Sequence, residues 1–166
     1  MSDLSLTIAP LRETDLSAIE RLDDRAFGPG RFAKSAYRLR EDIAPDFALS
    51  CVARVGTLLV GANRMTRVFA GGKRALLLGP LTVDPPFRDR GIGRELMEFS
   101  LEAARAAGHS LVILVGDEPY YARVGFKRVP RGRLALPGPV DAARILYREL
   151  AEGAFEGVSG AVARAA

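Results

Sequence analysis

The order of apolar and polar residues predicts short strands with a few amphipathic helices between them. Residues 4–11 alternate in part, which predicts a first strand that Pro10 stops. In residues 14–27 the apolar side chains recur at helical spacing instead, and Thr14 is a suitable N-cap for the helix that they predict. A short second helix is expected at residues 34–41.

Strands dominate the middle of the chain. Residues 47–55 and 57–68 predict two strands that Gly56 joins in a hairpin. A fourth strand is expected at residues 74–83, although Pro80 stands in its middle. Because proline has no N–H group to donate to a neighbouring strand, Pro80 belongs at a sheet edge or at a bulge.

The second half of the chain predicts one long helix and several more strands. Residues 91–107 place apolar side chains on one helical face, and residues 110–115 are apolar almost throughout, as in a strand buried on both faces. A short strand at 126–129 and a loop at 130–139 follow. Residues 153–166 are small and rich in glycine and alanine, which predicts an irregular tail.

The turn before the long helix combines glycine with arginine. The first backbone N–H groups of a helix have no partner inside the helix, and the helix dipole adds partial positive charge at the same place. Gly91 and Gly93 have no side chain to hold a phosphate away from the backbone, and the turn carries three arginines, Arg88, Arg90 and Arg94. The sequence therefore predicts a phosphate site in this turn.

The spacing within the turn separates the common kinds of phosphate loop. A dinucleotide-binding loop would need a third glycine where Leu96 stands, and a P-loop would need a Gly-Lys-Ser/Thr sequence that does not follow. The arrangement Arg88-x-x-Gly91-x-Gly93 resembles the acetyl-CoA signature of the GNAT superfamily of N-acetyltransferases. In that family the turn holds the CoA pyrophosphate on backbone amides.

A second stretch carries the same resemblance. The apolar segment 110–115 precedes Tyr121, and Gly125 and Phe126 follow that tyrosine at the spacing of the family's Y-x-x-x-G-F helix. The likeness extends over residues 4–150.

The resemblance implies an α/β fold. Its central sheet would be mixed and mostly antiparallel, with about six to seven strands flanked by helices, and its fourth and fifth strands would splay apart. The pantetheine arm of CoA would lie in that gap. Residues 142–150 have helical propensity, but the family has its last strand there, beside the strand at 126–129, and we expect the strand. A single domain is expected over residues 1–166.

Acetyl-CoA is the cosubstrate that the resemblance implies, and no metal is expected. The expected cofactor-binding residues lie on the fourth strand and in the turn: Leu81, Thr82, Val83, Arg88, Asp89, Arg90, Gly91, Ile92, Gly93 and Arg94.

The implied reaction is direct attack of an uncharged amine on the thioester. In the family a tyrosine at the position of Tyr121 protonates the leaving thiolate, and a tyrosine pKa near ~10 suits a thiolate of similar basicity. A purely packing role for Tyr121 is the alternative, and Tyr120 is expected to point elsewhere on the same helix. The general base stays open. Three acids lie near the expected cleft and are candidates: Asp84, Asp117 and Glu118. Each of them also suits a turn or a helix start.

The composition argues against several classes of protein, namely nucleic-acid-binding, zinc-binding, membrane-spanning and secreted proteins. The net charge of +4 suits an anionic cofactor but is modest for a nucleic-acid-binding protein. One cysteine and one histidine exclude a Cys/His zinc cluster, and Cys51 lies in an apolar strand pattern typical of a core residue. No apolar run approaches the ~20 residues of a membrane span, and no secretory signal is evident, so a cytoplasmic protein is expected.

Two other functions stay open at this point. One is a regulatory module that binds acyl-CoA without turnover, and the other is a phosphate- or nucleic-acid-binding module that uses the turn 88–94. For the enzyme, the expected partner is a small-molecule or peptide amine, with neither nucleic acid nor membrane, and a homodimer stays open. The superfamily acetylates small amines, antibiotics, amino acids and protein N-termini, and the sequence does not select among them.

Overall fold

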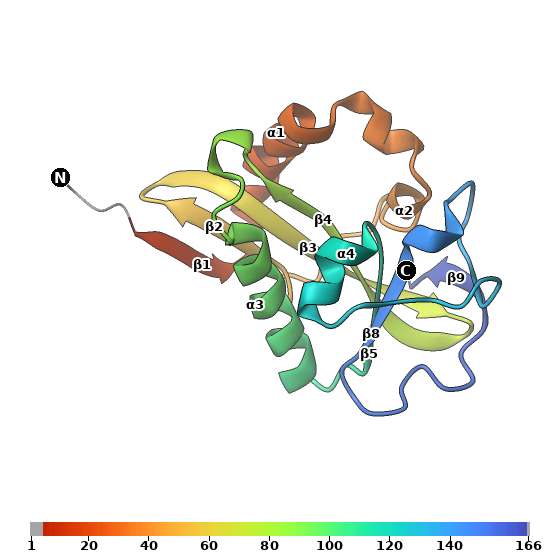
Figure 1. Ribbon diagram of the computed structural model, residues 1–166. Helices are drawn as coiled ribbons and strands as arrows, with labels where there is room; N and C mark the ends of the chain where they lie inside the picture. Colours follow the sequence, from red (N-terminus) through yellow and green to blue (C-terminus); the bar gives the residue numbers. More distant parts are fainter. Residues whose placement is uncertain (1–4, 166) are drawn as a thin grey trace.

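A nine-stranded sheet forms the centre of the computed structural model (Figure 1). The structure describes residues 5–165, without the side chains of residues 32 and 33. Seven strands follow one another in the order β1-β2-β3-β4-β5-β8-β6, while β9 pairs with β3 and β7. The strands are β1 (Leu6–Pro10), β2 (Cys51–Val55), β3 (Leu58–Ala70), β4 (Lys73–Val83), β5 (Leu111–Val115), β6 (Lys127–Arg128), β7 (Leu134–Ala135), β8 (Ile145–Glu149) and β9 (Gly160–Arg164).

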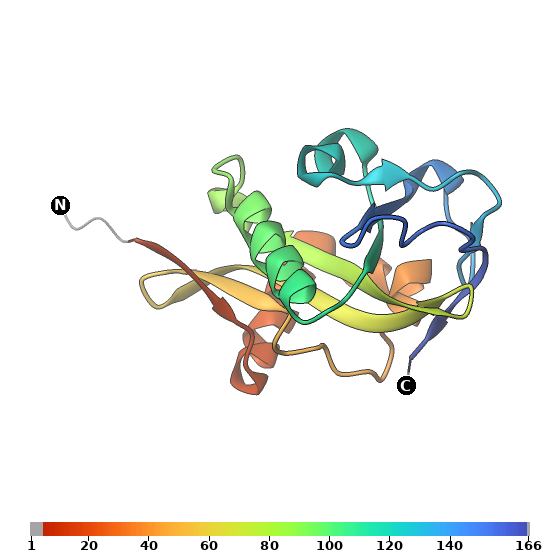
Figure 2. The same ribbon diagram turned by 90° about the horizontal axis from the view of Figure 1, so that it is seen from below.

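Helices cover both faces of the sheet, with α3 on one face and α1 on the other (Figure 2). Side chains that alternate along β2 show the same division, because Val52 packs with the α1 residue Leu22, whereas Ala53 packs with the α3 residue Leu96. The α-helices are α1 (Leu16–Phe27), α2 (Ser35–Arg38), α3 (Ile92–Ala106) and α4 (Glu118–Tyr121). The 3-10 turns span Glu13–Asp15, Pro29–Ala33, Pro85–Phe87, Ala122–Val124 and Ala142–Arg144.

The fourth and fifth strands splay apart, as the family resemblance implied. They run parallel, and β4 pairs with β5 only at Leu76 and Leu77, although β4 continues to Val83. The other pairs along the main path of the sheet are antiparallel. The predicted fold class, a mixed and mostly antiparallel sheet flanked by helices, is confirmed.

A bulge interrupts β4 just beyond the last pair with β5. The register with β3 passes from Met65 opposite Leu78 to Asn63 opposite Leu81, so that one residue of β3 faces Gly79 and Pro80. Of the two places that the sequence allowed for Pro80, the structure has the bulge. The bulge leaves Leu81–Val83 paired with β3 while the opposite edge of β4 turns away from β5.

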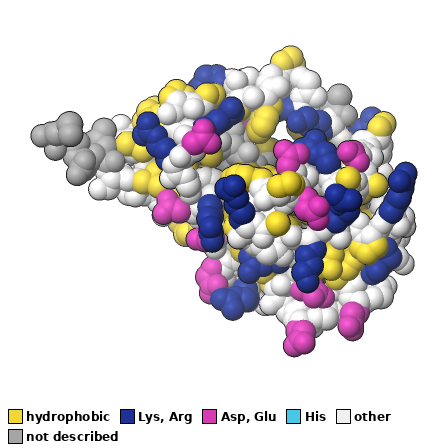
Figure 3. Space-filling view, in the orientation of Figure 1, with side chains coloured by type: hydrophobic (Ala, Val, Ile, Leu, Met, Phe, Trp, Pro, Cys, Tyr) yellow, Lys and Arg dark blue, Asp and Glu magenta, His cyan; other side chains and the backbone are white. Residues whose placement is uncertain are grey.

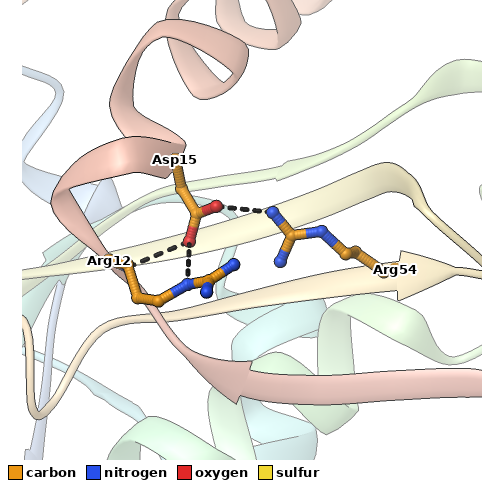
Figure 4. A network of polar contacts seen from close by, with 3 residues as sticks. All are labelled: Arg12, Asp15 and Arg54. Atoms are coloured by element: carbon orange, nitrogen blue, oxygen red, sulfur yellow. Dashed lines mark hydrogen bonds and ion pairs between the residues drawn. The ribbon is translucent and has the colours of Figure 1, made fainter.

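The start of α1 differs from the prediction. Thr14 does not cap the helix, because residues 13–15 form a 3-10 turn and α1 begins at Leu16. A buried carboxylate, Asp15, organises this turn: it accepts a hydrogen bond from the Arg12 N–H at 2.9 Å and pairs with Arg54 of β2 at 2.5 Å (Figure 4). Burial raises the pKa of Asp15, but the Arg12 N–H and the Arg54 guanidinium outweigh it and bring the pKa below its ordinary value.

The end of the chain is more regular than its composition predicted. Residues 145–149 form β8, so the expected strand is confirmed against their helical propensity. The expected irregular tail at 153–166 is wrong in part, because residues 160–164 form β9. The reason lies in β3, which extends beyond β2: β2 reaches Asn63, and β9 pairs with Val68–Ala70 further along the same edge.

Charged side chains of both signs mix on the surface. On the face shown in Figure 3, Lys and Arg side chains alternate with Asp and Glu rather than forming one continuous basic area. In the part of the chain that the structure describes, no helix has the length and apolar character that crossing a membrane requires.

Candidate active site

A cleft of about 630 Å³ opens where β4 leaves β5. Its walls come from the end of β4, the start of α3, the α4 segment with its following turn, and the end of α1. The lining residues are Phe27, Leu81, Thr82, Val83, Phe87, Arg88, Asp89, Gly91, Ile92, Gly93, Arg94, Met97, Tyr120, Tyr121, Arg123 and Val124. The structure thus brings Tyr121 and nine of the ten expected cofactor-binding residues to one cleft, and Arg90 is the residue that it places elsewhere.

The start of α3 has the form that an anion site needs. Gly91 is the N-cap, with φ 78° and ψ 6°, a left-handed conformation in which a side chain is strained. No side chain of the described residues caps this end, and space is open around the position that a Gly91 Cβ would take. The first amide N–H groups of α3 therefore face the cleft without a side-chain partner.

The three arginines of the turn differ in position. Arg88 and Arg94 line the cleft, and each donates through Nε to the protein, to the Val83 carbonyl at 3.2 Å and to Glu98 at 2.9 Å. Arg90 instead holds its guanidinium over the Phe87 ring, 5.4 Å from the ring centroid. Two guanidinium groups are thereby held beside the amides of α3.

Tyr121 is fixed by packing on several sides. Its ring lies edge-on to Tyr120 and Phe126, with centroid distances of 4.9 and 6.1 Å. Gly116 packs so closely against the ring that a Cβ there would collide with it. Burial, with smaller effects of Tyr120 and Asp117, raises the pKa of Tyr121 to about 12 against the opposing charges of Arg144 and Arg40. The hydroxyl therefore keeps its proton through the neutral and mildly alkaline range.

Tyr120 does not point away from the site, contrary to the prediction. It lines the same cleft, and a Cβ on Gly93 would collide with its hydroxyl. Burial raises the pKa of Tyr120, with Arg123 opposing. The prediction treated neighbours on a helix as facing different ways, whereas α4 is a single turn from which the Tyr120 hydroxyl reaches Gly93 at the start of α3. Tyr120 and Arg123 are cleft residues that the sequence analysis missed.

None of the three acids weighed as a general base lines the cleft. Each has a cationic partner: Asp84 pairs with Arg25 at 3.5 Å, Asp117 with Arg144 at 3.5 Å, and Glu118 with Arg128 at 3.1 Å.

A carboxylate that the sequence did not single out reaches the cleft wall. Thr82, a lining residue, donates a hydrogen bond from Oγ1 to Asp23 of α1 at 2.7 Å. Burial raises the pKa of Asp23 above its ordinary value, although the Thr82 hydroxyl and nearby arginines oppose the shift. No local signal marks Asp23, which is one of several acids on an amphipathic helix.

Two reactive residue types lie outside the site. Cys51 is fully buried and donates a hydrogen bond from its thiol to the Leu96 carbonyl at 3.2 Å, and its pKa is raised to about 11, chiefly by burial. His109, whose pKa burial lowers, is not among the residues of the cleft. Across residues 5–165 no group of three or more His, Cys, Asp or Glu side chains could hold a metal ion.

Comparison with known proteins identifies the family. A model of the acetyltransferase (GNAT) domain matches residues 47–128, which contain the bulged strand, the glycine turn and the α4 segment. The chain belongs to the GNAT superfamily. The match begins after α1 and α2 and ends before β7, β8 and β9.

Relatives of known family extend the GNAT likeness over almost the whole chain. The N-acetyltransferase YhbS of Escherichia coli (strain K12) is 29% identical over 150 residues, which cover 89% of each chain. YjhQ of the same strain is 33% identical over 119 residues, 69% of this chain and 66% of the relative.

Solved GNAT structures agree with the architecture. The crystal structure of YhbS from Escherichia coli in complex with CoA superposes with a TM-score of 0.83 at 26% identity, over 99% of this chain and 92% of that one. A GNAT acetyltransferase from Brucella melitensis in complex with acetyl-CoA gives a TM-score of 0.65 at 26% identity, over 83% and 94% of the two chains. The chain is an N-acetyltransferase that depends on acetyl-CoA, and the uncapped start of α3 with its glycines and arginines fits that cosubstrate.

Proposed function

We propose that the chain transfers the acetyl group of acetyl-CoA directly to a primary amine, with Tyr121 as the general acid. One observation carries the proposal: Tyr121 and the uncapped start of α3 share one cleft, at the splay between β4 and β5. A group that binds the cosubstrate's phosphates and a group that can donate a proton thus line the same cleft.

The cosubstrate lies along the cleft in this proposal. Backbone amides at Gly91, Ile92 and Gly93 bind the pyrophosphate, because helix dipole and N–H groups point toward it. The turn residues Arg88, Asp89 and Arg94 surround it, and both arginines have guanidinium groups on the wall, whereas Arg90 packs over the Phe87 ring. The pantetheine arm runs along Leu81, Thr82 and Val83, where the edge of β4 has left β5.

Direct attack suits the side chains that line the cleft. Acetyl-CoA supplies an activated acetyl group, so the protein needs to orient the amine, stabilise developing charge and manage two protons. Among the described lining residues there is no cysteine or serine that could form an acyl-enzyme, and Cys51 is buried away from the cleft. Tyr121 holds a proton on Oη, which it passes to the departing sulfur.

A steady-state experiment tests direct transfer. Initial rates measured against both substrates should give intersecting lines, and the intact protein should gain no acetyl group when it is incubated with acetyl-CoA alone. Cys51→Ala should keep kcat within about threefold if the thiol takes no part. Parallel lines, or a stable acetyl-enzyme, would contradict direct attack. Binding of acetyl-CoA without turnover of any small-molecule or peptide amine would favour a non-catalytic module instead.

A further inference from the structure

An arginine beside the β4 bulge has no partner in the part of the chain that the structure describes. Arg40 follows α2, and its Nε is buried without a hydrogen bond. Its side chain forms no ion pair with the described residues either. It interacts with neighbouring charged groups, such as Arg64 and Asp23, only through longer-range electrostatics. A mostly buried guanidinium without hydrogen bonds is costly for a folded protein.

The other half-buried arginines of this region are bonded. Arg64 donates to the Ile43 carbonyl, to the Arg40 carbonyl at 3.4 Å and to Thr66 at 3.3 Å. Arg64 therefore ties the segment after α2 to β3, which is a structural role. Arg40 sits on the segment that Arg64 holds in place, with its own guanidinium left unused.

Arg40 lies beside the splay of β4 and β5, although neither Arg40 nor Asp23 is among the residues that line the cleft. Its Nη2 would lie 3.6 Å from a Cβ on Gly79, so the guanidinium rests on the bulge at the splay. Its charge acts on the pKa of Tyr121, which burial raises, and on that of Asp23, which hydrogen-bonds to the cleft residue Thr82. The charge of Arg40 thus acts on both the proposed general acid and the half-buried Asp23 carboxylate.

The charges around Arg40 do not balance. Burial and the neighbouring Arg64 lower the pKa of Arg40 to about 10, so it stays a cation at neutral pH. Asp23 is the carboxylate whose charge reaches it, and two guanidinium groups therefore face one carboxylate. An ammonium group alone would meet excess positive charge here, whereas a molecule with a carboxylate would relieve it.

We propose that the acceptor is an amine that also carries a carboxylate, of the amino acid class, with Arg40 binding the carboxylate and Asp23 facing the amine. The inference rests on the proposed function and names its second substrate. A guanidinium and a carboxylate form two parallel charge-assisted hydrogen bonds, and Arg40 has its donors available for them. Asp23 uses Oδ1 for Thr82, which leaves its other oxygen for the amine.

A set of matched acceptors tests this. Each proteinogenic amino acid is compared with its own amide, and β-alanine with propylamine, by following release of CoA thiol. The wild type should prefer the carboxylate member of the best pair by roughly 30-fold or more in kcat/KM, the range of hydrogen bonds to charged groups. Arg40→Met should abolish this preference while turnover of the amides changes little, and Arg40→Lys should restore part of it. Calorimetry with the enzyme–CoA complex should show the same pattern in amino acid affinity.

Two measurements separate ligand binding from a structural role. Arg38→Met is the matched control, because Arg38 is an exposed arginine two residues away that bonds to the Pro137 carbonyl at 3.1 Å, and it should leave the preference intact. The Tm of ligand-free Arg40→Met should equal or exceed that of the wild type, since a buried unpaired charge is removed. A lower Tm together with an unchanged preference would overturn the proposal.

Other outcomes overturn the inference without touching the acetyltransferase. Equal loss of turnover for acids and amides in Arg40→Met would mean that Arg40 acts on the thioester rather than on the acceptor. A wild type that prefers the amides, or peptides, would show that the acceptor lacks the carboxylate. Binding of acetyl-CoA with no acetylation of any amine would instead contradict the proposed function, and the inference with it.

Discussion

Two regions beside the splay of β4 and β5 are built differently: the turn end, which lines the cleft, and the Arg40 end, whose Arg40 and Asp23 are not among the lining residues. The turn end comes from one continuous stretch, residues 88–94, whose side chains are largely exposed and whose binding groups are backbone amides. The Arg40 end comes from α1, the segment after α2, and the bulge of β4, and its groups are half-buried side chains. A backbone site needs only local geometry, whereas the buried charges of the Arg40 end meet only when distant segments pack together.

This difference has a functional consequence. The turn end can bind the same phosphates in any chain that keeps the strand, the glycines and the helix start. The reason is that its binding groups are backbone amides, which do not depend on the type of side chain. The Arg40 end depends on a few particular side chains, so it is where acceptor choice can change while cosubstrate choice stays fixed. Substitutions at each end should therefore affect different kinetic constants.

The largest expected effect belongs to the turn. In Gly91→Val, a β-branched residue at φ 78° is strained, and its side chain covers the amides. Acetyl-CoA affinity measured by calorimetry should fall by more than about 10²-fold. Gly108→Val is the matched control, because Gly108 has φ 88° with open space around it but lies just past the other end of α3. It should carry a similar strain and bind acetyl-CoA normally, and equal affinity in both variants would refute a role for Gly91.

The next effect tests the middle of the cleft. Tyr121→Phe keeps the ring that packs on Phe126 and removes the donor, so kcat should fall by roughly 10²-fold while acetyl-CoA affinity changes far less. Tyr147→Phe is the matched control, because Tyr147 stacks on Phe155, at 4.0 Å between ring centroids, and is not a lining residue. Wild-type kcat in Tyr121→Phe would rule out the proposed acid.

Tyr120→Phe separates the two tyrosines. Since the Tyr120 hydroxyl faces Gly93, its removal should change the KM for acetyl-CoA and leave kcat nearly unchanged. A fall in kcat larger than that of Tyr121→Phe would assign the proton to Tyr120 instead.

The contrast between the turn and the Arg40 end also explains which features could be predicted from the sequence. The turn could be identified because its chemistry lies in one motif, the splay was expected from the family resemblance, and Pro80 indicated only an edge or a bulge, because it cannot donate a ladder bond. Asp23 and Arg40 could not, because each is an ordinary polar residue until α1 and α2 pack on the sheet. The same holds for β9, a strand of small residues that owes its existence to the edge of β3 beyond β2.

A smaller effect measures how much the arginine side chains, as opposed to the backbone amides, contribute to acetyl-CoA affinity. Arg88→Gln and Arg94→Gln should each weaken acetyl-CoA binding by about 3- to 10-fold, because exposed guanidinium groups are screened by solvent and salt. The losses should shrink as salt concentration rises. Arg105→Gln, an exposed arginine near the far end of α3, should have no effect. Losses as large as that of Gly91→Val would show that side chains, rather than amides, carry the phosphate site.

The smallest effect concerns the proton on Tyr121. Burial is the main cause that raises its pKa from the ordinary 10.0 to about 12, so the folded protein holds this proton more tightly than the unfolded chain does. The stabilisation is complete below the unfolded pKa and is lost as pH rises through the folded one, since between them only the unfolded chain has released the proton. The difference in unfolding free energy between wild type and Tyr121→Phe should therefore decrease from about pH 10 to about pH 12. Denaturant titrations across this range measure it, with Tyr147→Phe alongside. A constant difference would mean that Tyr121 has the same pKa in the folded and the unfolded chain, which is incompatible with a phenol buried in the wall of the cleft.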